Sequence, residues 1–170
     1  TVLTQDPLSF YQWGLRMLLD GAGYWEIQQD APRDVVVAVI DRGVHTNHED
    51  LRDKLAPGGG YSFITNSPTL DFVDDSKSPN ASMTHGQCSA SIVAANTGNS
   101  VGMGGVFHRA FIMPLQSDGH LSEAINYAID NKADVILVAG GAGSEGGWVW
   151  PMYQNKSGLP QKDAYSEKNI

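Results

Sequence analysis

The chain has 170 residues, 41% hydrophobic and 18% charged, which predicts one folded domain and argues against disorder. Its formal net charge of −8 disfavours nucleic acid as a partner, because the phosphates would be repelled. The sequence has no run of about 18 apolar residues that would predict a transmembrane helix, and its single cysteine, Cys88, excludes an internal disulfide. An acidic composition with few lysines favours a secreted or extracytoplasmic, cation-binding protein.

The first half of the chain predicts a buried strand and a helix separated by a long loop. Residues 1–34 are expected to form a short helix and turns that wrap the domain. Residues 35–40 are mostly β-branched, which is typical of a buried strand. The loop at 56–82 is rich in turn-forming residues and contains a candidate short strand at 61–64. A helix of small residues is expected to begin at His85.

The second half continues with a glycine-rich bend at 96–105, a strand at 110–115, an amphipathic helix at 122–129 and a buried strand at 134–139. Pro114 favours an edge or end position for its part of the sheet. Strands that alternate with helices predict an α/β fold, a parallel sheet with helices on both faces. The remainder of the chain follows neither the helical nor the strand period.

Two polar residues stand where such a fold concentrates chemistry. Asp41 ends the strand that begins at Val35, and His85 stands at the start of the following helix. The carboxyl ends of parallel strands aim side chains into a crevice. An aspartate there can fix the tautomer of a histidine, which gives two members of a Ser-His-Asp triad.

The residues around this pair resemble the subtilisin-like serine proteases. Asp41-Arg-Gly-Val44 followed by His48-Glu-Asp50-Leu51 resembles that family's Asp motif, and His85-Gly86 with the small residues after it resembles the His motif. Asp134-Val135-Ile136 is similar to the strand that lines the substrate cleft. The resemblance covers about residues 35–143 and implies that residues 1–170 are the N-terminal part of one catalytic domain with a three-layer fold.

The segment before residue 35 and the acidic stretch at 71–75 are similar to the kexin-like branch. Arg42 departs from that branch, in which an acidic residue at this place favours basic substrates. Gln87 and Ser91 depart from the usual His-Gly-Thr-x-x-Ala-Gly motif of the wider family. Residues expected to contact substrate are Arg42, Asp118, Gly140, Gly141, Ala142, Gly143 and Glu145, the glycines by strand addition.

The resemblance implies hydrolysis of peptide bonds in which Asp41 orients His85 and His85 acts as general base. The family's nucleophilic serine and oxyanion asparagine have no match in this sequence, because Ser144, Ser157 and Ser166 lack the Gly-Thr-Ser setting. We therefore expect a complementary C-terminal segment or second chain to carry them. The isolated chain is expected to be inactive.

A structural calcium ion is also expected. Asp50 matches the family's carboxylate ligand, Asn99 falls on the ligand loop after the His helix, and Gln5 is the candidate ligand near the N-terminus. Calcium binds six to eight oxygens from carboxylates, amides and carbonyls, and a glycine-rich loop can supply carbonyls.

Three alternatives stay open. A catalytically inactive pseudoprotease of the same fold could bind or regulate partners. The sequence from Gly141 to Gly146 matches the dinucleotide-binding pattern, although a poor helix start follows it. Cys88, one helical turn from His85, could act as a thiol nucleophile, although a small buried residue is the plainer interpretation.

Overall fold

The computed structural model describes residues 6–19, 28, 30–68, 83–117 and 119–139. The elements in chain order are the short 3-10 helix η1 (Ser9–Tyr11), α1 (Trp13–Leu19), β1 (Val35–Asp41), the 3-10 helix η2 (Arg52–Lys54), β2 (Tyr61–Ser62), α3 (Met83–Ala94), β3 (Ala110–Gln116), α4 (Leu121–Asp130) and β4 (Val135–Val138). The predicted elements are present with ends shifted by one or two residues. No helix in these ranges could cross a membrane.

The strands form a parallel sheet in the order β2-β3-β1-β4. β1 pairs with β3 along its whole length, from Val35 opposite Ala110 to Asp41 opposite Gln116. The β-branched residues of β1 therefore occupy the interior of the sheet, where they are covered on both faces. Asp41 lies at the carboxyl end of this strand, with a neighbouring strand end beside it.

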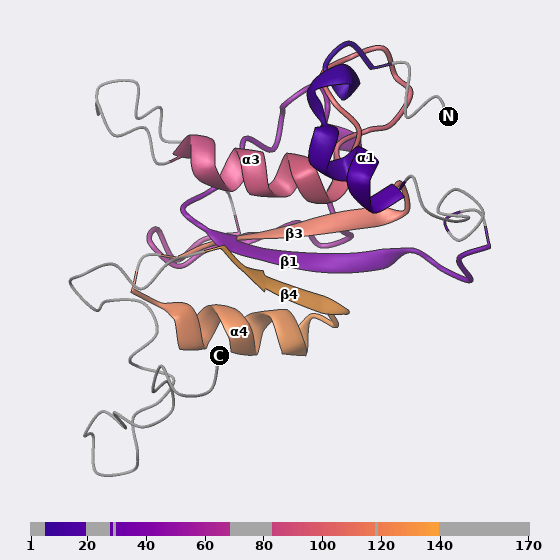
Figure 1. Cartoon of the computed structure of the whole chain (residues 1–170). Coiled ribbons are helices and arrows are strands. Elements are labelled where there is room, and N and C mark those ends of the chain that lie inside the picture. The colour runs from indigo at the N-terminus through magenta and orange to yellow at the C-terminus, as the bar shows by residue number, and fades with distance from the viewer. Residues whose placement is uncertain (1–5, 20–27, 29, 69–82, 118, 140–170) are drawn as a thin grey trace, which may run out of the picture.

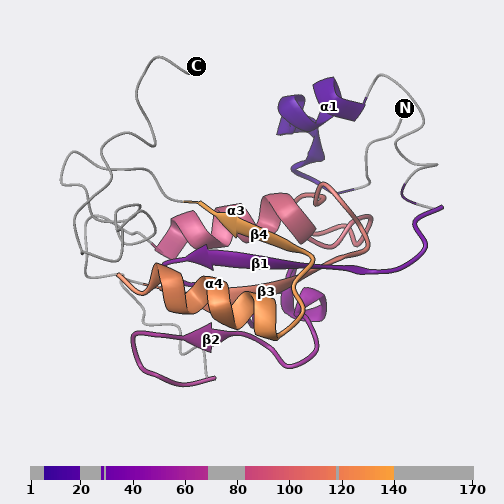
Figure 2. The same cartoon turned by 90° about the horizontal axis from the view of Figure 1, so that it is seen from below.

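Helices cover both faces of the sheet, as predicted: α3 lies on one side and α4 on the other (Figures 1 and 2). Side chains along β1 alternate between the two faces. Val37 and Val39 pack on the side of α3 with Ala90 and Ala94, whereas Ala38 and Ile40 pack toward α4. The α4 side of the core is formed by Ala38, Ile40, Ala56, Met113, Leu115, Leu121, Ala124 and Ala128.

The prediction that residues 134–139 form a buried strand is wrong for the described part of the chain. β4 pairs with β1 on one side and is the last strand in the sheet order. Val135 and Val138, at its two ends, are 49% and 40% exposed. An apolar run predicts a strand that can be covered, but it does not say which other segment covers it.

Pro114 lies in β3, which is an interior strand. On the β2 side, Ala56 donates its backbone N–H to Ile112, and Phe63 donates to Gln116. Residues 57–60, which lie between these two bonds, do not pair with β3. Pairing resumes at Tyr61, opposite Leu115. The missing N–H of proline therefore faces a local gap in the pairing, which explains how the residue is tolerated inside the sheet.

Candidate active site

Asp41 presents a shielded carboxylate at the end of β1. Its side chain is 3% exposed, and its backbone oxygen accepts the N–H of Ser117, 2.9 Å away. Its Oδ1 accepts the N–H of Arg42 at 2.7 Å, and its Oδ2 lies 2.8 Å from Nδ1 of His85. Backbone and side-chain donors thus hold the carboxylate in one orientation.

His85 lies in the first turn of α3, and its side chain contacts the Asp41 carboxylate. An ionised carboxylate can only accept hydrogen bonds, so Nδ1 of His85 carries the proton that Oδ2 accepts. In the neutral ring this leaves the lone pair on Nε2. The His85 side chain is 61% exposed, so this second nitrogen belongs to a ring that a substrate can reach. The arrangement can take a proton at Nε2 and stabilise the resulting imidazolium through Asp41.

Gly86 explains how the start of α3 comes this close to β1. A Cβ at position 86 would overlap the backbone oxygen of Gly43 and lie 3.2 Å from the Cβ of Asp41. Gly43 itself has a φ of 136°, in the region that favours glycine. Two glycines therefore permit the contact between the helix and the turn after β1 that places His85 beside Asp41.

Gln87 adds a second tie between α3 and the same turn. Its Oε1 accepts the backbone N–H of His45 at 2.9 Å, while its Nε2 is buried and has no hydrogen-bond partner in the part of the chain that the structure describes. The departure from the family's threonine at this place thus supplies a contact to the turn. Cys88 is exposed, which contradicts the expectation of a small buried residue, because it lies on the outer side of α3.

Arg42 follows Asp41 directly and has an exposed side chain. Its backbone oxygen accepts the Nε2 proton of Gln116 at 2.9 Å, and Gln116 in turn accepts from the hydroxyl of Ser62 at 2.7 Å. This buried polar chain ties the ends of three strands together beneath Arg42. The other predicted substrate contacts, Asp118, Gly140, Gly141, Ala142, Gly143 and Glu145, lie outside the described residues.

The predicted calcium residues Asp50 and Asn99 lie together. Asn99 donates its amide to Oδ1 of Asp50 at 2.8 Å, and the backbone N–H of Met103 donates to Oδ2 at 3.2 Å. The Asn99 oxygen accepts the N–H of Val101. Both oxygens of Asp50 thus face protein donors, and calcium would require the Asn99 amide to turn its oxygen inward. Gln5 lies outside the described residues.

Asp6 is a residue that the sequence interpretation missed. Its carboxylate accepts the N–H of Gly98 at 2.8 Å and of Ser100 at 3.0 Å, and the residue is only 3% exposed. Gln12 exchanges two further hydrogen bonds with the backbone of Gly104. Asp6 and Gln12 therefore both bind the N-terminal segment to the glycine-rich bend. The described residues contain no group of three His, Cys, Asp or Glu side chains that could hold a metal ion.

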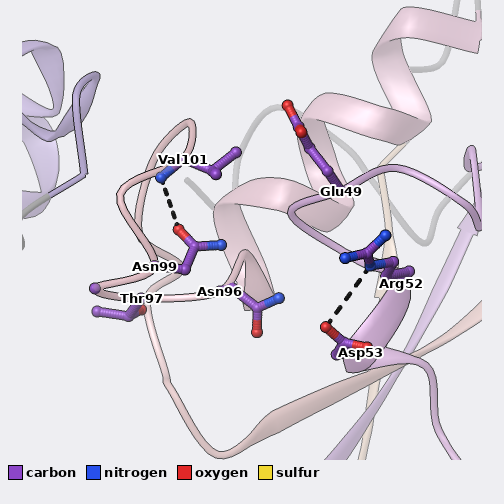
Figure 3. Close-up of a pocket in the computed structure, with 8 residues that line it drawn as sticks. Glu49, Arg52, Asp53, Asn96, Thr97, Asn99 and Val101 are labelled. Carbon is purple, nitrogen blue, oxygen red and sulfur yellow. Dashed lines mark hydrogen bonds and ion pairs between the residues drawn. The ribbon is translucent and has the colours of Figure 1, made fainter.

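An open pocket of about 410 Å³ lies at the end of α3 remote from His85 (Figure 3). Glu49, Arg52 and Asp53 line one side, and residues 96–99 with Val101 line the other. Asn96 follows the last residue of α3, Ala94, by two positions, so about 13 Å of helix separates this pocket from His85. The pocket therefore borders the Asp50 loop and is separate from the Asp41–His85 pair.

Groups away from the Asp41–His85 pair also have shifted pKa values, among them Asp134 and His108. Hydrogen bonds from Arg33 and from the backbone of Val36 hold the pKa of Asp134 at about 2. This exposed ion pair ties the start of β4 to the start of β1, where solvent screening keeps its contribution small. Burial lowers the pKa of His108, and the charges of Lys54 and Arg109 lower it further.

A family model described as the subtilase family, peptidase S8, matches residues 32–167. The chain belongs to the subtilase family. The matched residues include β1, which ends at Asp41, α3, which carries His85, and β4.

Thermitase from Thermoactinomyces vulgaris is 33% identical to this subtilase chain over 150 residues, which is 84% of the chain and 46% of thermitase. A thermophilic serine proteinase from Bacillus sp. strain AK1 is 35% identical and covers 59% of the chain and 24% of that protein. A solved lanthipeptide protease covers 91% of the chain and 45% of its own, with 22% identity and a TM-score of 0.61, which shows the fold alone. The chain thus spans about half or less of these relatives.

Proposed function

We propose that this subtilase chain provides the orienting carboxylate and the general base of a serine endopeptidase. The observation that carries the proposal is the 2.8 Å contact between Asp41 and Nδ1 of His85, in which a shielded carboxylate meets an exposed ring. His85 would accept the proton of a serine hydroxyl at Nε2 and return it to the leaving amine. Asp41 would keep the tautomer and stabilise the imidazolium between these steps.

The serine nucleophile and the oxyanion asparagine would come from a complementary C-terminal segment or chain. The free side of β4 supports this, because Val135 and Val138 remain exposed among the described residues and the strand order ends there. We propose that the complementary segment adds to the sheet beside β4. Hydrogen exchange tests the idea: the β4 amides that do not bond to β1 should exchange more slowly in the complete protein than in this chain alone. Equal exchange would contradict it.

Labelling of the complete protein with a fluorophosphonate tests the proposed activity. The proposal predicts an adduct on one serine in the wild type and loss of that adduct in His85→Ala. This chain alone should give no adduct. A wild-type protein that remains unlabelled, with calcium supplied, would instead favour an inactive pseudoprotease that binds or regulates its partners.

We propose that Arg42 disfavours substrates with two adjacent basic residues before the cleaved bond. Its exposed guanidinium stands one residue after Asp41 and would repel a cation bound nearby. Placement in the kexin-like branch therefore stays a prediction. Asp118 would favour it, because this residue resembles an acidic cleft residue of that branch that suits basic substrates. Peptides that differ only in a lysine or leucine before the cleaved bond test this. Arg42→Ala should raise kcat/KM for the lysine peptide selectively, and no change would remove Arg42 from the specificity site.

We also propose that calcium stabilises the loop around Asp50, with Asn99, Gln5 and backbone carbonyls as further ligands. The support is the contact between Asp50 and Asn99, the second of which lies on the glycine-rich bend. Titration with calcium after chelation should raise the melting temperature, and Asp50→Asn should abolish the increase. An unchanged melting temperature in the wild type would contradict the site.

A secreted or extracytoplasmic location is proposed as well. It is supported by the acidic composition and by relatives such as the halolysin-like extracellular serine protease Nep of Natrialba magadii. The major intracellular serine protease of Bacillus subtilis is also a relative, at 28% identity, so family membership alone does not decide the location.

A further inference from the structure

Ser89 reaches the carboxylate of Asp41 from the same helix as His85. It lies four positions after His85 on α3, a spacing that puts both side chains on one face of the helix. Its hydroxyl donates to Oδ2 of Asp41 at 3.3 Å, and the same oxygen lies 2.8 Å from Nδ1 of His85. One carboxylate oxygen therefore receives two side-chain donors from successive turns of α3.

We infer that Ser89 is a positioning residue that holds the Asp41 carboxylate in the plane that His85 requires; this rests on the proposed protease function. The final torsion of an aspartate side chain is broad and roughly two-fold, so the carboxylate can twist unless its oxygens are held. The Arg42 N–H holds Oδ1 at 2.7 Å, and the Ser89 hydroxyl is a second side-chain donor to Oδ2, one helical turn from His85.

The shielding of Asp41 makes this donor important. The carboxylate is 3% exposed, so water has little access to replace a lost hydrogen bond. At 3.3 Å the bond is longer than a strong charge-assisted one, so we assign it the contribution of one typical net hydrogen bond. The hydroxyl also remains bonded while His85 passes between neutral and protonated forms, because its bond is to Asp41. The orientation of the carboxylate therefore stays fixed throughout proton transfer.

The helix supplies a matched control. Ser91 is half-buried on the same helix, but two positions from Ser89, which turns it to a different side of α3. Ser91→Ala therefore makes the same serine-to-alanine change in α3 as Ser89→Ala but removes no hydrogen bond to Asp41. Ser89→Thr retains a hydroxyl at the active position and tests for rescue.

The experiment measures peptide hydrolysis and the low-field proton resonance of His85 Nδ1–H in the complete protein. Ser89→Ala should lower kcat about 3- to 10-fold with KM unchanged, the range expected for loss of one typical net hydrogen bond. The resonance should shift in Ser89→Ala and stay in place in Ser91→Ala. Ser89→Thr should restore most of kcat and the wild-type resonance.

An unmoved resonance in Ser89→Ala would overturn the inference, even with reduced turnover, because the defect would then be structural. An unchanged kcat would overturn it as well. Absence of the resonance in the wild type would remove the Asp41–His85 bond on which the inference depends. Failure of wild-type hydrolysis would reject the proposed protease function, whereas the shift of the resonance would still decide the role of Ser89.

Discussion

Asp41 and Asp50 are both buried aspartates, with 8% and 2% of the whole residue exposed, at opposite ends of α3, and they differ in the groups that donate to their carboxylates. At Asp41 one donor is the ring of His85, which also has an exposed side. At Asp50 the side-chain and backbone donors are the Asn99 amide and the Met103 N–H, and amides cannot act as acids or bases near neutral pH. Burial alone therefore does not distinguish a candidate catalytic aspartate from a structural one; the chemistry of the donor does.

The largest expected effect is on turnover, at the Asp41 end. His85→Ala should reduce kcat of the complete protein by about six orders of magnitude, because the general base is lost. The melting temperature should change little, since the side chain is 61% exposed. His120→Ala, which removes another exposed imidazole, serves as the control. Comparable activity in the two variants would refute the assigned role of His85.

Gly86→Ala should give the largest loss of stability. The added methyl group would overlap the Gly43 oxygen, and relief requires the helix to move from β1, at a cost of about 3 kcal/mol in the free energy of unfolding. Gly14→Ala is the matched control, because nothing lies within 4 Å of its Cβ position. Alanine there should stabilise α1 by up to about 1 kcal/mol. Equal stability of the two variants in urea unfolding would contradict the close approach at Gly86.

Asp50→Ala should weaken the fold more than the chemistry. The change leaves the Asn99 amide and the Met103 N–H without their acceptor, which costs about 2 kcal/mol. Well below its melting temperature, the variant should keep kcat within a few-fold of wild type. Denaturant unfolding and peptide hydrolysis on the same preparation measure both quantities. Loss of turnover without loss of stability would reverse the distinction between the two aspartates.

The smallest effect concerns pH. Burial, Lys54 and Arg109 lower the pKa of His108 from its usual 6.5, so the unfolded chain takes up this proton first as pH falls. Stability is complete above the unfolded pKa and declines as pH falls through it toward the lower folded value. The loss between about pH 7 and pH 5 should be a few tenths of a kcal/mol, because the group is partly exposed. His108→Gln should flatten the profile relative to wild type; identical slopes would contradict the shift.

The sequence predicted the layers of the fold because β1, β3 and the amphipathic α4 carry local patterns. The sequence also identified Asp41 and His85 as candidate catalytic residues, because Asp41 ends a strand and His85 lies in the first turn of a helix. Ser89 and Gln87 were not predicted as contacts, because their reach depends on the rotation of α3 and on its distance from β1. That distance follows from the pairing of Gly86 with Gly43, which no periodic pattern reveals.

The contacts of the N-terminal segment were harder to predict than those of α3. Asp6 bonds to Gly98 and Ser100, more than 90 positions along the chain, and no local signal predicts such a contact. Gln5 was chosen from the resemblance, and the neighbouring Asp6 is the residue that docks on the bend. The exposure of β4 was not predicted for a similar reason. The burial of a strand depends on which other segments pack against it, and the strand's own sequence does not show this.

Asp41→Asn and Asp50→Asn, compared in the complete protein, test the central claim most directly. The same near-isosteric change at two shielded carboxylates removes the charge while keeping the volume. At Asp41 an asparagine can favour the wrong tautomer of His85, so kcat/KM for a peptide substrate should fall by about four orders of magnitude. Asp50→Asn should stay within a few-fold of wild type at a temperature where both are folded. Equal losses in the two variants, or an active Asp41→Asn, would contradict the account.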